Sequence, residues 1–220
     1  MFQYLIIDFD STFVTVESLD ELAGLSLQNN PERDKILKKI DRITKLGMDG
    51  TLPFYESLEA RLQLFQSSKT DIEALISLLK KSITPSFKKN KDLFLKNNKK
   101  IYIVTGGFRE YIVPVLSEFG IFQNHIFANT FVFNKNGTMT GLDKKNFLAY
   151  PKGKAKAVKS LKLSGKIVVI GDGYTDFEIK KEKAADIFVA FVENVKRDKI
   201  TKLADKVINN FDELLTWINR

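Results

Sequence analysis

Two aspartates follow a short apolar run near the start of the chain, in YLIIDFDST (Tyr4–Thr12). Asp8 and Asp10 are two residues apart, and side chains with that spacing in a strand point to the same face. Two carboxylates held so close repel each other, and the pKa of one rises unless a cation lies between them. The pair therefore predicts a bound metal, a shared proton or a strongly basic partner.

Two more aspartates, Asp172 and Asp176, lie in GDGYTD after another apolar run. An isolated pair of aspartates is equally well explained by the capping of a turn or helix. Four carboxylates in one cleft, however, would scarcely stay ionised without a divalent cation. Cys is absent and His125 is the only histidine, so the available ligands are oxygens. Oxygen ligands favour a hard ion such as Mg²⁺.

A third motif, Thr105-Gly106-Gly107, supplies a hydroxyl and backbone N–H groups that no side chain crowds. This composition is typical of an anion-binding nest at a strand-to-helix turn, although a plain tight turn is the alternative. Lys152 precedes a predicted helix and could reach the same anion as a point charge, although a single lysine is more often on the surface. The combination suits a phosphoryl group. Because no motif contains histidine, a carboxylate is the available nucleophile, which predicts an aspartyl-phosphate intermediate.

Four apolar runs predict the buried strands that position these motifs. They are continuous rather than alternating, as expected for strands covered on both faces. These runs are Tyr4–Ile7, Ile101–Val104, Lys166–Ile170 and Asp186–Phe191. Amphipathic segments between them predict helices, including one with a capping-box pattern at Thr70 and others over 154–163 and 212–218. We therefore expect an α/β fold with a Rossmann-like parallel sheet and helices on both faces. Ligands bind beyond the carboxyl ends of such strands, so the three motifs should converge on one pocket.

The stretch between the first two strands is far longer than a single crossover requires and is nearly all helical in pattern. We predict an inserted helical cap over residues 16–82, with residues 1–15 and 83–220 forming the α/β catalytic core. Pro85, which cannot continue a helix, marks the end of the insertion. Asn136-Gly137 lies between two β-rich runs within residues 127–142, which predicts a small β-hairpin.

The composition narrows the class of protein. The net charge of +8 could indicate a nucleic-acid partner, but the lysines are scattered and no base-stacking aromatic motif accompanies them. A solvated lysine surface is the better interpretation, so no nucleic-acid partner is predicted. No apolar run reaches the roughly 18 residues of a membrane span. The first residues lack a basic region and reach an acidic residue at position 8, unlike a signal peptide. The absence of Cys agrees with a reducing cytoplasm.

The motifs DFDST, TGG, the later lysine and GDGYTD, in this order, resemble the four motifs of the haloacid dehalogenase superfamily of phosphatases. The resemblance extends over essentially the whole chain. It implies that Asp8 is the nucleophile and that Asp10 protonates the leaving oxygen and then activates water. It further implies that Asp8, the backbone carbonyl of Asp10 and Asp172 bind Mg²⁺, with Asp176 supporting the metal site. The phosphate and substrate ligands that it implies are Thr105, Gly106, Gly107, Lys152 and Thr175.

Two segments of the insertion resemble phosphoserine phosphatases in particular: DFDSTFVTVESLDELA and MDGTLPFYESLEARLQL. This resemblance implies that Arg61 binds the substrate carboxylate and Glu17 the α-ammonium group, while Met48 and Phe54 line the lid. One anion and one cation suit a zwitterionic amino-acid phosphate. The implied activity is magnesium-dependent hydrolysis of O-phospho-L-serine in serine biosynthesis.

Other interpretations remain. The substrate could be another small phosphomonoester, such as a sugar phosphate or a methylthio-ketose phosphate. Tyr174 is bulkier than the alanine that relatives often carry and is expected either to narrow the cleft or to pack beneath it, which bears on substrate preference. A receiver-type signalling domain also gathers acids, a threonine and a lysine around an aspartate, but it has no helical insertion after its first strand.

Overall fold

The structure is a computed structural model and describes residues 3–218. A six-stranded parallel sheet has the order β3-β2-β1-β6-β7-β8. Its strands are β1 (Tyr4–Ile7), β2 (Ile101–Phe108), β3 (Ile126–Asn129), β6 (Ile167–Gly171), β7 (Ile187–Phe191) and β8 (Lys206–Ile208). The Rossmann-like α/β prediction is confirmed.

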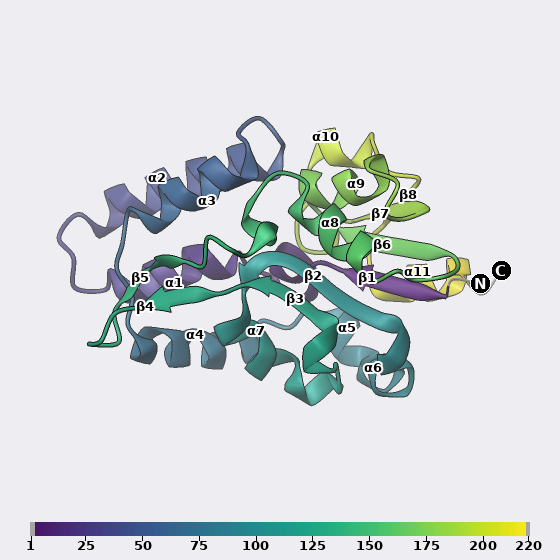
Figure 1. Cartoon of the computed structure of the whole chain (residues 1–220), viewed down its shortest axis with the longest axis horizontal. Coiled ribbons are helices and arrows are strands. Elements are labelled where there is room, and N and C mark those ends of the chain that lie inside the picture. Colours follow the sequence, from purple (N-terminus) through teal and green to yellow (C-terminus); the bar gives the residue numbers. More distant parts are fainter. Residues whose placement is uncertain (1–2, 219–220) are drawn as a thin grey trace.

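Helices cover both faces of this sheet, and Figure 1 shows them as two layers. One layer contains α5 (Pro85–Lys89), α6 (Lys91–Asn97), α7 (Arg109–Leu116) and α11 (Phe211–Ile218). The other contains α8 (Gly153–Ser160), α9 (Tyr174–Lys181) and α10 (Asp198–Thr201). Successive side chains of β1 alternate between the two layers: Leu5 and Ile7 join one hydrophobic cluster and Ile6 the other. Burial on both faces therefore explains why the strand sequences are continuously apolar.

Four helices occupy the predicted insertion between β1 and β2. They are α1 (Ser18–Ser26), α2 (Arg33–Met48), α3 (Phe54–Leu62) and α4 (Lys69–Lys81). In Figure 1, α2 and α3 lie as a pair beyond the carboxyl ends of the strands, whereas α4 lies beside α7. Only three of the 16 residues of α2 are buried. The division of the chain into a cap and a core at residues 16 and 82 stays a prediction.

Local sequence sets the limits of α4. Ser68 is its N-cap, and the Ser68 hydroxyl accepts a hydrogen bond from the Asp71 N–H while the Asp71 carboxylate accepts one from the Ser68 N–H. The capping box therefore begins two residues before the predicted Thr70. Pro85 starts α5 rather than only ending α4, because proline lacks an N–H that the first turn leaves unpaired anyway.

A small antiparallel hairpin joins β4 (Phe131–Phe133) to β5 (Met139–Leu142) around Asn136-Gly137, as predicted. The first part of the predicted β-rich run, however, forms β3 at the edge of the main sheet. The backbone N–H of Met139 donates to the Ser67 carbonyl at 2.8 Å, which attaches the hairpin to the loop before α4. Short 3₁₀ turns occupy Asn98–Lys100, Ser117–Phe119, Gln123–His125 and Phe147–Ala149. Among residues 3–218, no helix combines the length and the apolar composition that a membrane span requires.

Candidate active site

Three buried carboxylates gather at the carboxyl edge of the sheet. Asp8 follows β1, Asp172 follows β6 and Asp176 lies in the first turn of α9, and ligand oxygens of all three lie within 4.8 Å of one another. Strand β1 ends at Ile7, and a π-helical turn follows in which Ser11 has φ of 51°. Asp8 and Asp10 therefore reach the same site through a turn and not, as predicted, through the alternation of a strand.

Two cations balance this acidic cluster. The Lys154 Nζ lies 2.9 Å from Asp8 Oδ1 and 2.8 Å from Asp176 Oδ1. The Arg197 Nε lies 2.9 Å from Asp172 Oδ2. Burial alone would lower the pKa of Lys154, but the carboxylates of Asp176 and Asp8 outweigh burial and raise that pKa, so the ammonium stays charged. Burial also raises the pKa of Asp176 well above its ordinary value, and Asp8 adds to this rise.

The donor set of the cluster fits a hard divalent cation. All three carboxylates are nearly or fully inaccessible to solvent, and the Asp172 Oδ1 accepts a hydrogen bond from the Thr12 hydroxyl at 3.1 Å. Carboxylate oxygens are the type of ligand that Mg²⁺ prefers in proteins. The triad differs from the predicted ligand set in containing Asp176; the Asp10 backbone carbonyl stays a predicted ligand.

Asp10 is held in place by the start of α1. Its Oδ1 accepts hydrogen bonds from the Ser18 N–H, at 2.8 Å, and from the Ser18 hydroxyl. Burial raises the pKa of Asp10 to about 7, the Ser18 hydroxyl opposes this rise, and the nearby Asp8 adds to it. A carboxyl group that titrates near neutral pH is suited to give up and take back a proton.

The TGG motif forms a hydroxyl-and-amide cradle at the end of β2. The Gly107 N–H donates to the Thr105 hydroxyl at 3.0 Å. The strand continues to Phe108, so the two glycines lie within its last residues and not in a separate turn. A Cβ atom at position 106 would lie 2.2 Å from Cζ of Phe54. Glycine at this position therefore allows the Phe54 ring of α3 to pack directly over the cradle.

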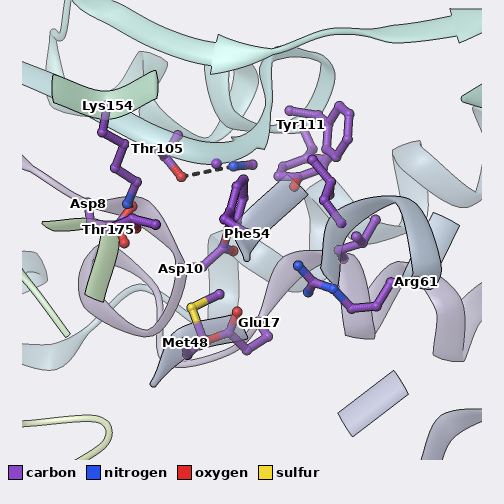
Figure 2. A pocket seen from close by; sticks show the side chains of 15 residues that line it. Asp8, Asp10, Glu17, Met48, Phe54, Arg61, Thr105, Tyr111, Lys154 and Thr175 are labelled. Atoms are coloured by element: carbon purple, nitrogen blue, oxygen red, sulfur yellow. Dashed lines mark hydrogen bonds and ion pairs between the residues drawn. The ribbon is translucent and has the colours of Figure 1, made fainter. Parts of the chain in front are cut away.

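Figure 2 shows the pocket that these elements enclose. Ten of the residues predicted from the sequence line it: Asp8, Asp10, Glu17, Met48, Phe54, Arg61, Thr105, Gly106, Gly107 and Thr175. Asp172 and Asp176 complete the acidic cluster beside it. The structure thus brings these predicted residues together, while their functional roles stay predictions.

The pocket also contains one basic residue, Arg61, and one further acidic residue, Glu17. Arg61 is 3% exposed; its Nη1 donates to Asp20, at 3.2 Å, and to Thr44, at 3.1 Å. Within residues 3–218 no hydrogen bond from its Nη2 is found. The Glu17 carboxylate accepts hydrogen bonds from the Ser11 hydroxyl, at 2.7 Å, and from Arg197, at 3.2 Å.

Lys152 requires a correction. Its Nζ lies 2.8 Å from Glu182, its side chain is 53% exposed, and it does not line the pocket of Figure 2. Lys152 precedes α8 with φ of 61°, whereas Lys154 lies in the first turn of that helix with its side chain 6% exposed. The helix start therefore turns Lys154, and not Lys152, toward Asp8.

Sequence reasoning missed three further residues. Arg197 connects Asp172 to Glu17, Ser18 holds Asp10, and Tyr111 lines the pocket from α7. Ser18 directly follows Glu17 and was detectable as a helix-cap candidate. Arg197 and Tyr111 lie outside every motif, and no local pattern distinguishes them from surface arginines and core aromatics.

One prediction concerns pH and Glu17. Burial, together with Asp10 and Asp172, raises the pKa of Glu17 from 4.5 to about 8. Between these pH values the folded, metal-free protein retains a proton that the unfolded chain has released, so rising pH destabilises the fold, by up to about 1.4 kcal/mol per pH unit. Thermal melts in chelator should show a falling Tm over this window. Glu17→Gln should reduce the slope, to which Asp10 also contributes, and the exposed Glu73→Gln should leave it unchanged. Equal slopes in all three proteins would contradict the prediction.

Comparisons with known proteins agree with this geometry. The sequence profile of the haloacid dehalogenase-like hydrolases matches residues 5–179. The chain is 33% identical over 215 residues to the chloroplastic phosphoserine phosphatase of Arabidopsis thaliana, covering 96% of this chain and 70% of that protein. It is 33% identical over 211 residues to the Homo sapiens phosphoserine phosphatase, covering 94% and 89%. A phosphoserine phosphohydrolase-like protein from Francisella tularensis superposes with a TM-score of 0.88 at 32% identity, covering 98% and 99%.

The chain therefore belongs to the haloacid dehalogenase-like hydrolase family. Within that family it is a phosphoric monoester hydrolase of the phosphoserine phosphatase-like type.

Proposed function

We propose that this enzyme hydrolyses O-phospho-L-serine to L-serine and phosphate, with Mg²⁺ as its metal, as a cytoplasmic step of serine biosynthesis. One observation carries the proposal: a pocket that has a phosphate cradle and lies beside an acidic cluster also contains an acidic residue, Glu17, and a basic residue, Arg61. The relatives named phosphoserine phosphatase support the same substrate.

At the phosphate end, Asp8 supplies the nucleophile. An Asp8 carboxylate oxygen forms a bond to phosphorus while the bond from phosphorus to the serine oxygen breaks, and Asp10 gives its proton to that leaving oxygen. Asp10 then takes a proton from water, which attacks the aspartyl-phosphate and releases phosphate and the Asp8 carboxylate. Lys154 and the Thr105 hydroxyl bind the phosphoryl oxygens, and Gly106 and Gly107 leave room for those oxygens at the end of β2. Mg²⁺, held by Asp8, Asp172 and the Asp10 carbonyl with Asp176 in support, would neutralise charge on the phosphoryl group.

At the amino-acid end, the charges of the pocket match those of the substrate. Glu17 binds the α-ammonium group and Arg61 the carboxylate, so a phosphomonoester without these groups loses two charged contacts. Met48 and Phe54 close the pocket between the two ends.

Substrate access requires movement. The pocket leaves only about 20 Å³ for a water-sized sphere, against roughly 300–1,000 Å³ for ordinary ligand sites. Phe54 covers the cradle, and the Lys199 Nζ lies 3.0 Å from Asp49, just after α2. We propose that the helical cap over residues 16–82 opens through displacement of α2 and α3 and closes over the substrate.

The test is phosphate release from a panel containing phospho-L-serine, phosphothreonine, sugar phosphates and an aryl phosphate, with Mg²⁺ or with chelator. Phosphoserine should be preferred, and chelator should abolish turnover. Arg61→Ala should lower kcat/KM for phosphoserine by about 10–100-fold and affect the aryl phosphate less, because only phosphoserine offers a carboxylate to Arg61. Arg42→Ala, an exposed position on α2, is the matched control.

Other results would revise the proposal in defined ways. Turnover of sugar phosphates that ignores Arg61 would keep the phosphatase chemistry and reject phosphoserine as substrate. Full activity in chelator would reject the metal.

A further inference from the structure

The Tyr111 hydroxyl is a buried polar group without a partner. Tyr111 lies in the first turn of α7, is fully inaccessible to solvent, and its ring packs among Phe9, Phe108 and Phe131 with centroids 6.3–6.4 Å away. Within residues 3–218, its hydroxyl oxygen makes no hydrogen bond. Burying an unpaired hydroxyl costs free energy, so such a group calls for a functional explanation.

The hydroxyl lies at the wall of the substrate pocket. A Cβ atom at Gly107 would lie 3.0 Å from the Tyr111 oxygen and 3.1 Å from Asp10 Oδ2, so both oxygens border the space that this glycine leaves open. Figure 2 shows the Tyr111 oxygen facing the pocket on the side where Arg61 lies. The aromatic packing around the ring fixes this direction.

The charge state of Tyr111 makes it a donor. Burial raises its pKa well above 10, the Asp10 carboxylate adds to this rise, and the Arg61 guanidinium opposes it. The hydroxyl therefore keeps its proton at any working pH. A neutral hydrogen-bond donor beside a cation suits an anion with two acceptor oxygens, such as a carboxylate.

The hydrogen bonds that Arg61 already makes indicate that a second residue is needed to bind the substrate carboxylate. Its Nη1 is already committed to Asp20 and Thr44, which leaves Nη2 for the substrate. A carboxylate held through one nitrogen has a second oxygen that needs its own donor. The phosphoryl oxygens have Lys154 and the TGG cradle, and the Glu17 carboxyl group is already bonded to Ser11 and Arg197.

We propose that Tyr111 donates a hydrogen bond to the carboxylate of the bound amino-acid phosphate, beside Arg61, and so helps to select substrates that carry a carboxylate. This inference rests on the proposed function. It makes Tyr111 a specificity-determining residue whose hydroxyl is unpaired in the free protein because its partner arrives with the substrate.

The test is Tyr111→Phe, which removes only the hydroxyl, assayed with phospho-L-serine and with phosphoethanolamine, which lacks the carboxylate. For phosphoserine, KM should rise roughly tenfold with kcat within about twofold, because the contact is equally strong in the ground and transition states. The constants for phosphoethanolamine should not change. The Tm should hold or rise, since an unpaired buried hydroxyl is lost. Tyr102→Phe, a buried tyrosine on the opposite face of the sheet, is the control.

Two results would overturn the inference while the proposed function stands. An unchanged KM for phosphoserine would exclude the contact. A fall in kcat that is equal for both substrates would place the hydroxyl at the reacting atoms instead of the carboxylate. If the wild-type enzyme does not prefer phosphoserine to phosphoethanolamine, both the proposed function and this inference fail, and the wild-type assay alone identifies that case.

Discussion

Asp8→Asn is expected to abolish the turnover of every phosphomonoester, lowering kcat by roughly 10⁴-fold or more, as for the loss of other enzymatic nucleophiles. The asparagine amide has the size of the carboxylate but does not attack phosphorus. Its oxygen can still accept the hydrogen bond that the Phe9 N–H donates to Asp8 at 2.7 Å. The substitution therefore removes the chemistry and keeps the local geometry.

The fold is expected to survive this substitution. Asp8 is one of three carboxylates within 4.8 Å of one another, so neutralising it relieves repulsion in the metal-free protein. Lys154 loses one ionic partner but keeps Asp176, at 2.8 Å. The two changes oppose each other, and thermal melts in chelator should give a Tm within a few degrees of wild type.

The assay measures phosphate release from phosphoserine and from an aryl phosphate under saturating Mg²⁺. Asp41→Asn, on the exposed face of α2 and paired with Lys45, serves as the control and should retain full activity. If Asp8→Asn keeps more than a few per cent of turnover while folded, Asp8 is not the nucleophile, and direct attack by water becomes the better mechanism.

The burial of a strand and its place in the sheet explain whether it could be predicted from the sequence. Strands β1, β2, β6 and β7 are buried on both faces, and their apolar runs are visible in the sequence. The two edge strands are less distinct in the sequence, each for its own reason. Strand β8 spans only Lys206–Ile208, with one buried residue, and β3 is joined in the sequence to the run that forms the hairpin.

In the site, the sequence predicted that the aspartates converge because their motifs follow strands that the sequence itself reveals, although it did not predict the turn by which Asp10 reaches the site. Asp8 and Asp172 meet because their strands β1 and β6 are neighbours in the sheet. Arg197 reaches Asp172 and Glu17 from the loop before α10, and Glu17 is 180 residues away in the sequence. No local pattern marks such a contact, and only the folded arrangement shows that Tyr111 borders the pocket.

Two of the three lysines in AYPKGKAKAV, Lys152 and Lys154, test how much depends on the place where α8 begins. Lys154→Met should lower kcat/KM by roughly 10²–10³-fold, the usual effect of losing one charged donor to a transition-state oxygen. Lys152→Met should leave kcat within about twofold and stability within about 0.5 kcal/mol, because its ion pair with Glu182 is exposed. Phosphate release by both variants makes the comparison, and loss of activity in Lys152→Met alone would restore the original assignment.

Stability separates a catalytic role of Lys154 from a structural one. Without its ammonium, Asp8 and Asp176 face each other in a buried site with no cation between them, so metal-free Lys154→Met should melt well below wild type. A divalent cation bound by the same carboxylates would supply the missing charge, and Mg²⁺ should therefore recover much of the Tm. Activity should not recover with it, because a cation among the aspartates does not replace a donor that reaches the phosphoryl oxygens. If Mg²⁺ restores both stability and turnover, Lys154 serves only to hold the carboxylates apart.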